Sequence, residues 1–373
     1  MRQTHKKFQR NPNRAAGWQM TERSLAILGL LYRYRFLPTP LLARLIPGNL
    51  DVTYKHIKQL FHVGLTRRFI LPSEPYANGR NAAGDLYHYL DSLKALDFLE
   101  ASGWAPPYSL SRRLIRQNRE NKFYDQSRPH LFLRHEAMLS RFRGYLELSC
   151  RSTSRGVSLT EWQQGPELAR RVTVPEASYD KQAGRWSPLP SFTELPLNPD
   201  GLFALTVTTA PEEHTLLPFF LEVDRNTETI PRFLQKLRAY FHFIVNQKRY
   251  LAEYGLPLIR AVLTLTNTPA RAEQLRQAAF AHASFIGFAA ASKLFWFAPE
   301  TFFTTPTIVP TANPARPLKL AVGLHHPGLL LEPRWLSPKD DTPHALTDLP
   351  DAPPLLRNPL IRPVPAPRDG IIT

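Results

Sequence analysis

The sequence contains a single cysteine, Cys150, in 373 residues. A lone thiol cannot form an internal disulfide, and by itself it excludes multi-thiolate zinc and iron–sulfur sites. No apolar run reaches the roughly 18 residues that a membrane-spanning helix needs, and the basic N-terminus lacks the apolar stretch of a signal peptide. Phosphate loops of the GxGxxG or Walker type are missing, as is the Gly-x-Ser-x-Gly of serine hydrolases. We therefore expect a cytoplasmic protein with no membrane association and no common hydrolase or nucleotide site.

Positive charge is what the sequence has in excess, with 47 Lys and Arg against 31 Asp and Glu and a formal net charge of +16. The excess is uneven: residues 1–150 hold 24 basic and 11 acidic side chains, whereas residues 151–373 hold 23 and 20. A basic half joined to a nearly neutral half indicates that the first half contacts a polyanion. The alternative is a surface whose charge only maintains solubility.

The distribution of apolar, turn-forming and charged residues predicts five segments. They are a basic arm (1–19), a first domain (20–105), a basic linker or helix (106–134), a second domain (135–300) and a C-terminal tail (301–373). The tail holds 15 of the 36 prolines, too many for long helices or central strands. We expect it to be extended and to dock in part through Leu329, Leu330, Leu331 and Trp335.

Three short helices are predicted at the start of the first domain from apolar residues at helical spacing. The first begins after Thr21. The second has Thr39 as its N-cap, is followed by a proline at the first helical position, and runs through Ile46. The third is capped by Asp51 and closes at Gly64.

A hairpin follows these helices. Strands are predicted over 65–71 and 86–90, and the loop between them contains Asn78-Gly79, a strong hairpin signal. A last helix spans 91–102. Three helices followed by a hairpin are typical of a winged helix-turn-helix.

In a winged helix the third helix enters the major groove, and the hairpin contacts the DNA backbone or the minor groove. The predicted DNA-binding residues lie on that helix, on the hairpin and in the basic segment behind it: Tyr54, Lys55, Lys58, Arg67, Arg68, Arg80, Arg112, Arg113 and Arg116. The helix residues would face bases or phosphates, and the hairpin arginines would bind phosphates. The last three arginines would extend this footprint, unless they belong to a solvated helix face. A winged helix that docks a protein instead of DNA is the alternative.

The second half predicts an α/β domain with a mixed sheet. Its elements are a helix over 135–150, a strand over 158–162, a Pro-rich loop to Asn198, strands over 202–207 and 217–224, a helix over 231–250, a strand over 259–266, a helix over 271–282 and a strand over 294–297. This order resembles the PD-(D/E)xK nuclease fold. The predicted class of the whole chain is therefore α+β, with a winged helix followed by a nuclease-like α/β domain.

Acidic residues stand where that nuclease fold binds Mg²⁺. Asp200 and Glu222 would lie side by side and ligate the ion through carboxylate oxygens. The nuclease pattern has a lysine two residues after the second acid, but this sequence has Asp224 at that position. Lys236 on the next helix could take the place of the missing lysine. Asp200, Glu222, Asp224 and Lys236 are thus the catalytic candidates. The alternative, which we favour, is a structural ion network that also engages Arg225, with no cofactor and no catalysis.

Several stretches together resemble the replication-relaxation family, winged-helix proteins associated with bacterial plasmids and integrative elements. They are MTERSLAILGLLYRYRFLPTPLLARLIPGNLDVTYKHIKQLFHVGLTRRFI, LRHEAMLSRFRGYLEL, LNPDGLFAL and FFLEVDRNTETIPRFLQKLRAYFHF, within about residues 20–300. The resemblance implies DNA binding connected with plasmid replication, copy control or relaxosome function. It carries no defined catalytic activity onto particular residues.

The leading hypothesis is a non-enzymatic protein that binds double-stranded DNA. Replication or relaxosome proteins are its expected partners, and a homo-oligomer is compatible with the sequence. Two alternatives stay open: a Mg²⁺-dependent nuclease or nickase, and a protein-interaction adaptor.

Overall fold

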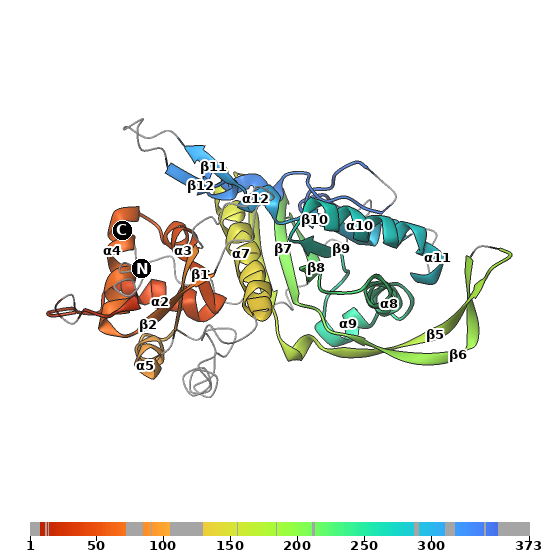
Figure 1. Cartoon of the computed structure of the whole chain (residues 1–373), viewed down its shortest axis with the longest axis horizontal. Coiled ribbons are helices and arrows are strands. Elements are labelled where there is room, and N and C mark those ends of the chain that lie inside the picture. The colour runs from red at the N-terminus through yellow and green to blue at the C-terminus, as the bar shows by residue number, and fades with distance from the viewer. Residues whose placement is uncertain are drawn as a thin grey trace. The chain divides into compact units, whose positions relative to one another are not determined.

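The computed structural model describes residues 8–11, 13, 15–71, 85–90, 92–104, 130–154, 156–183, 185–210, 213–286, 291–309, 318–338 and 341–349. The chain forms two compact units, residues 1–145 and 146–373, and Figure 1 labels most of their helices and strands. Helices precede a mixed sheet, in agreement with the predicted α+β class. Within the described ranges, no helix is long and apolar enough to cross a membrane.

The first unit combines helices with a small antiparallel sheet. Its elements are α2 (Glu22–Tyr34), β1 (Phe36–Pro38), α3 (Thr39–Leu45), α4 (Leu50–Val63), β2 (Thr66–Leu71), β3 (Asp85–Leu90) and α5 (Leu93–Ala101), and α7 (His130–Ser152) contributes to both units. The strands pair in the order β1-β3-β2. Ile27, Leu28 and Leu31 of α2 and Leu60 of α4 are wholly buried, so the predicted apolar stripes form the core.

Two helix starts in this unit differ from the prediction. Asn49, not Asp51, caps α4, because the Asn49 side chain accepts hydrogen bonds from the backbone N–H groups of Asp51 and Val52. Pro38, not Thr39, holds the cap position of α3, because the Thr39 hydroxyl donates to the Leu86 carbonyl of β3 at 2.9 Å. Thr21 caps α2 as predicted, and α4 ends at Gly64 in the left-handed conformation (φ 89°).

The second unit is built on a five-stranded sheet. The sheet is made of β4 (Val157–Gln163), β7 (Gly201–Ala210), β8 (Glu213–Asp224), β9 (Ala261–Thr266) and β10 (Phe295–Pro299), in the order β10-β9-β8-β7-β4. The strands from β4 to β8 pair antiparallel and those from β8 to β10 pair parallel. The other elements up to β10 are η2 (Pro166–Leu168), α8 (Ile230–Phe241), a π turn η3 (His242–Asn246), α9 (Arg249–Tyr254), α10 (Pro269–Ala281), α11 (Ala283–Ile286) and η4 (Ala291–Leu294).

The helix predicted over 231–250 is interrupted in the structure. α8 passes into the π turn after Phe241, and Lys248 then adopts a left-handed conformation (φ 49°) before α9 begins. A left-handed residue cannot continue a right-handed helix. The apolar spacing predicted one continuous helix because α8 and the π turn that follows it bury residues against the same core.

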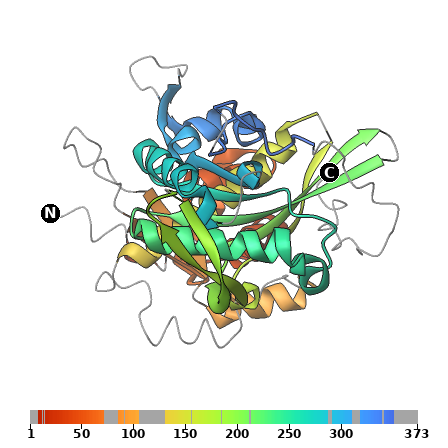
Figure 2. The same cartoon turned by 90° about the vertical axis from the view of Figure 1, so that its right-hand side faces the viewer.

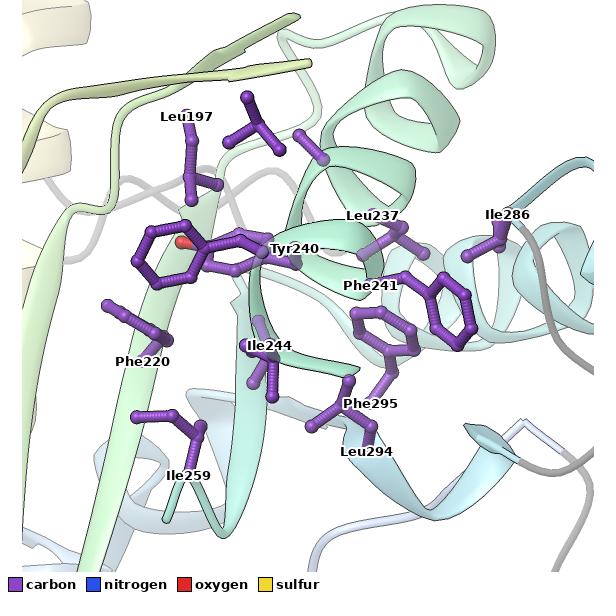
Figure 3. Packing of buried hydrophobic residues seen from close by; sticks show 14 of the residues in the cluster. Leu197, Phe220, Leu237, Tyr240, Phe241, Ile244, Ile259, Ile286, Leu294 and Phe295 are labelled. Carbon is purple, nitrogen blue, oxygen red and sulfur yellow. The ribbon is translucent and has the colours of Figure 1, made fainter. Parts of the chain in front are cut away.

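The face of the sheet under α8 and α10 is apolar over most of its area. Phe220, Val262 and Phe295 come from three neighbouring strands in register and are wholly buried. The Tyr240 ring of α8 lies 5.3 Å from the Phe220 ring, centroid to centroid. Figure 2 looks onto this helix-covered side, and Figure 3 shows Leu237, Phe241 and Ile244 packed around the same rings.

The segment predicted as a Pro-rich loop up to Asn198 is instead a long hairpin of β5 (Arg170–Asp180) and β6 (Arg185–Leu197). Val172 and Val174 are wholly buried, while Arg171 and Thr173 between and before them are exposed. This alternation is typical of a half-buried strand. The prediction was wrong because it took the prolines of this segment as breakers of any strand, although edge strands tolerate them.

Side chains cover the edge of β5 that faces away from β6. Gln247 Nε2 donates to the Thr173 carbonyl and an Arg249 guanidinium nitrogen donates to the Arg171 carbonyl, each at 2.7 Å. Arg238 donates to the Pro175 carbonyl in the same way. Three carbonyls that another strand would otherwise bind are therefore satisfied by the segment from α8 to α9.

Residues after 300 fold onto the second unit over part of their length. They form α12 (Thr301–Thr304), an antiparallel pair of β11 (Pro306–Val309) and β12 (Leu318–Ala321), α13 (Val322–His325) and η5 (Pro327–Leu331). The predicted docking residues Leu329, Leu330, Leu331 and Trp335 are all buried. Leu336 exchanges two backbone hydrogen bonds with Phe297 of β10, at 2.9 and 3.0 Å. These residues are thus less extended than predicted.

Candidate functional site

Helix α4 is held against α2 by polar contacts as well as by its apolar stripe. The Thr53 side chain is wholly buried and accepts a hydrogen bond from Arg23 at 2.7 Å. His56 Nδ1 lies 3.0 Å from the Ser24 hydroxyl, and burial, followed by the nearby Arg23 charge, lowers the His56 pKa. These contacts fix which side of α4 faces outward.

The outward side of α4 carries the predicted lysines. Lys55 and Lys58 are exposed, and no ion pair involves either of them in the part of the chain that the structure describes. Tyr54 is half-buried; burial raises its pKa, while the Arg44 charge lowers it and Asp51 raises it. Arg44 of α3 therefore belongs to the same basic face. Sequence reasoning missed Arg44, although it is the one charged residue in the short helix TPLLARL.

The two arginines of β2 lie in different environments. Arg67 is exposed, as a phosphate contact requires. The Arg68 guanidinium lies over the Phe61 ring, 3.7 Å from its centroid, and burial lowers the Arg68 pKa. Neighbouring residues of a strand point to opposite faces, which explains the difference. Arg80, Arg112, Arg113 and Arg116 lie outside the described residues.

A layer of polar side chains follows the apolar layer on the helix-covered face of the second unit's sheet. Glu222 comes two residues after Phe220 on β8, so it faces the same side, and Thr264 stands beside it in register on β9. Asp200 directly precedes β7; its backbone N–H donates to the Leu221 carbonyl, and its carboxylate accepts from the Val223 N–H at 2.8 Å. Asp200 and Glu222 therefore lie close together, as the nuclease-like order predicted.

Glu222 is 2% exposed and bound by protein donors. Its carboxylate accepts from Lys236 Nζ at 2.8 Å and from the Tyr240 hydroxyl at 2.5 Å. The pKa of Glu222 is raised to about 7, mainly by burial and also by the Asp200 charge. Lys236 and Tyr240 lower it, but their effect is smaller. Lys236 also pairs with Glu228 at 3.0 Å. Burial lowers the Lys236 pKa, but Glu222, Glu228 and Asp200 together outweigh that effect and raise it.

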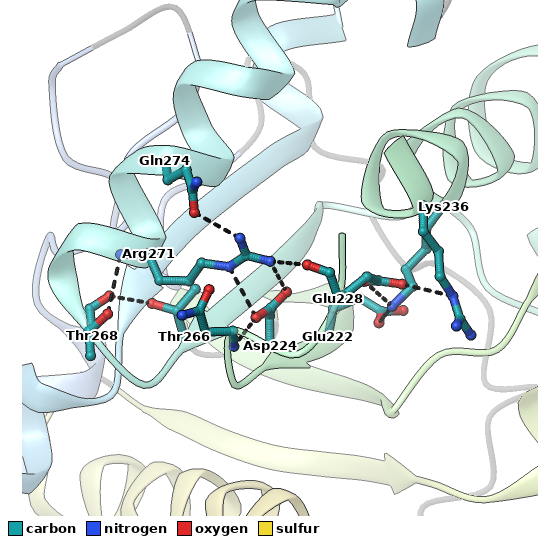
Figure 4. A network of polar contacts seen from close by, with 10 residues as sticks. Glu222, Asp224, Glu228, Lys236, Thr266, Thr268, Arg271 and Gln274 are labelled. Carbon is teal, nitrogen blue, oxygen red and sulfur yellow. Dashed lines mark hydrogen bonds and ion pairs between the residues drawn. The ribbon is translucent and has the colours of Figure 1, made fainter. Parts of the chain in front are cut away.

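Asp224 points to a different cation. Its two oxygens bind the Arg271 guanidinium at 2.9 and 3.2 Å, and both side chains are almost fully buried. Arg271 also donates to the Glu228 carbonyl at 2.6 Å and to the Gln274 side chain at 2.8 Å (Figure 4). Glu222 and Asp224, at the end of β8, therefore bind different cations, Lys236 and Arg271.

This donor set does not fit a Mg²⁺ site. Hard carboxylate oxygens suit Mg²⁺, but those of Glu222 and Asp224 accept hydrogen bonds from cationic side chains, and Asp200 accepts one from the backbone. Among the described residues, no group of three or more His, Cys, Asp or Glu side chains could hold a metal ion. The arrangement binds β8, α8 and α10 to one another through charge pairs.

A family model described as Replication-relaxation matches residues 28–257. The match begins within α2 and ends just after α9, so it includes parts of both units. No curated protein and no solved structure matches the chain.

Proposed function

The chain belongs to the replication-relaxation family, and from this premise we propose that it is a DNA-binding protein acting in the replication or relaxation of a plasmid or another mobile element. Duplex DNA would bind the first unit. Support comes from the order of elements from α2 to β3 and the strand pairing β1-β3-β2, which are those of a winged helix-turn-helix. Replication or relaxosome proteins are the proposed partners.

The observation that carries the proposal is the exposed basic side of α4 and its neighbours. Lys55, Lys58, Arg44 and Arg67 are all exposed on consecutive elements of this unit. In a winged helix, α4 would enter the major groove, and β2 would bring Arg67 to the backbone. Tyr54 stands beside Arg44 on the same side. Arg68, which stacks on Phe61, contributes by holding β2 against α4.

Binding of a duplex at increasing salt tests the proposal. Affinity should fall steeply, because each lysine or arginine that neutralises a phosphate releases counterions. Lys58→Ala and Arg67→Ala should each weaken binding and reduce the slope of log K against log salt by about 0.9. Lys181→Ala removes the same charge from an exposed turn residue of the second unit and serves as the matched control. No binding even at low ionic strength, together with a stable protein partner, would favour the adaptor alternative instead.

The second unit has a supporting role in this proposal. Its order α7-β4-β7-β8-α8-β9, with the β5–β6 hairpin inserted, supports the likeness to the PD-(D/E)xK nuclease fold. The carboxylates at the corresponding edge are bound by Lys236, Tyr240 and Arg271. We therefore propose a non-catalytic scaffold that recruits partners or a second copy of the chain.

A further inference from the structure

The outward side of α4 carries one apolar residue among its charges. Val52 is 38% exposed, and in the described part of the first unit only Phe8 shares this degree of exposure among large hydrophobic side chains. Val52 lies in the first turn of α4, three residues before Lys55. Residues at this spacing are neighbours on a helix surface, so Val52 and Lys55 form one adjoining pair.

The packing of the first unit does not account for this valine. The buried stripe of α4 consists of Thr53, Ile57, Leu60 and Phe61, and Val52 lies outside it. A β-branched residue has lower helix propensity than the straight-chain polar residues that suit a solvated face. Asp51 beside it has a local explanation, because an acidic residue in the first turn interacts favourably with the helix dipole.

We propose that Val52 contacts the C5-methyl group of a thymine in the major groove, so that α4 recognises a specific sequence rather than duplex DNA in general. This inference rests on the proposed DNA binding by the first unit. Thymine alone presents a methyl group in that groove, and an apolar side chain is its natural contact. Val52 has no polar side-chain atom for a phosphate, and it stands at the N-terminal end of the helix, where recognition helices reach base edges.

The charges around Val52 complete the recognition surface. Lys55, one turn further along the same side, is placed to donate to O6 and N7 of a guanine next to the thymine. Lys58, Arg44 and Arg67 surround the pair with exposed positive charge, which matches the phosphates that border the groove. An exposed apolar side chain surrounded by cations distinguishes this face from a face that only neutralises the phosphates of the DNA backbone.

The test uses the full-length protein and duplexes selected by it from a random library. Each thymine of the selected sequence is replaced in turn by deoxyuridine, which removes one methyl group and keeps the base pair. At one position the wild-type protein should lose about fourfold in affinity, as expected for about 0.8 kcal/mol per buried methyl. The Val52→Ala variant, whose alanine has a higher helix propensity than valine, should bind the original duplex more weakly than the wild type. Replacing the thymine at that position by deoxyuridine should then cause no further loss of affinity.

A matched control is Val245→Ala, which truncates an equally exposed valine (41%) of the second unit and should keep the full deoxyuridine penalty. The inference is overturned if selection yields no preferred sequence, if every deoxyuridine changes the affinity less than twofold, or if Val52→Ala retains the penalty. In each of these cases the protein still binds DNA and the proposed function stands. Failure to bind any duplex at low salt is a separate result that removes both.

Discussion

Two buried acids of this protein each bind a cation from a different helix. Glu222 and Asp224 are two residues apart on β8, yet one binds Lys236 and the other Arg271. Burying a carboxylate without a partner is costly, so each acid at this depth needs its own cation or donor. The acidic pattern that suggests a metal site is therefore explained by two buried ion pairs that join a strand to two helices.

His88 gives a pH-dependent prediction at the same scale. It is 1% exposed, its Nε2 lies 2.9 Å from the Thr39 hydroxyl, and burial, followed by the Arg68 charge, lowers its pKa to about 3. The unfolded chain binds a proton at His88 below about pH 6.5, whereas the folded chain does not. The His88 contribution is therefore complete above pH 6.5 and is lost as the pH falls toward 3, by about 1.4 kcal/mol per pH unit.

Urea unfolding at pH values between 7 and 4 measures this loss. His88→Gln, which has no titrating group, should show a shallower decline of unfolding free energy than the wild type, although it is less stable at neutral pH. His325→Gln, at an exposed histidine, should keep the wild-type slope. Equal slopes for the wild type and His88→Gln would contradict the prediction.

At the scale of elements, the β5–β6 hairpin is protected against pairing with other strands at both edges. Side chains from α8 to α9 bind the carbonyls of β5, as described above. Arg171 directs its carbonyl away from β6, and its register partner is Pro196. In an antiparallel ladder, the backbone N–H and C=O groups of two paired residues either point toward each other or both point away from the partner strand. The backbone of Pro196 therefore faces the outer edge of β6, where a proline offers no N–H to another strand.

Restoring a backbone N–H at position 196 should allow the outer edge of β6 to pair with a strand of another molecule. Pro196→Val adds a donor and a strand-forming side chain at the outer edge, so self-association should appear at lower protein concentration than in the wild type. Sedimentation velocity over a concentration series measures it. Glu194→Val adds the same side chain two residues earlier, on the same exposed face of the strand, without changing the backbone donors, and it should behave like the wild type. Association of both variants to the same extent would show that added apolar surface, not the edge, is responsible.

At the scale of the whole molecule, the excess positive charge and the nuclease-like strand order lie in different parts of the chain. Residues 1–150 carry a net +13, from 24 basic and 11 acidic side chains, while residues 151–373 carry only +3. The second unit holds the nuclease-like strand order, but its carboxylates are bound by protein donors. The molecule as a whole is therefore expected to bind DNA without cutting it.

A plasmid assay checks this expectation. Supercoiled plasmid incubated with the full-length protein and Mg²⁺ or Mn²⁺ should stay supercoiled, because Glu222 and Asp224 would have to give up Lys236 and Arg271 to bind an ion. Asp200→Ala should give the same result as the wild type. Nicking by the wild type that disappears in Asp200→Ala would instead establish the nuclease alternative.

Much of the first unit was predictable because its signals are local. The caps at Thr21 and Gly64 and the helical spacing of Ile27, Leu28 and Leu31 depend on residues within a few positions of each other. The positions along the chain of the strands that form the sheet of the second unit followed in the same way from short apolar runs. The caps predicted at Asp51 and Thr39 were wrong for two different reasons. The Asn49 side chain binds the backbone N–H groups at the start of α4, and the Thr39 hydroxyl binds the Leu86 carbonyl instead of capping α3.

The sequence by itself determined the order of the elements from α2 to α5, the positions along the chain of the strands in the five-stranded sheet, the basic first half and the proximity of Asp200 to Glu222. Only the tertiary structure decided that Arg68 stacks on Phe61 while Arg67 is exposed. It also decided that Glu222 binds Lys236 while Asp224 binds Arg271, and that the Pro-rich segment before Asn198 forms a hairpin. The physical reason is that caps and periodicity act within one or two turns of chain. The partner of a buried charge or of a strand edge comes from residues far along the sequence, and only packing selects it.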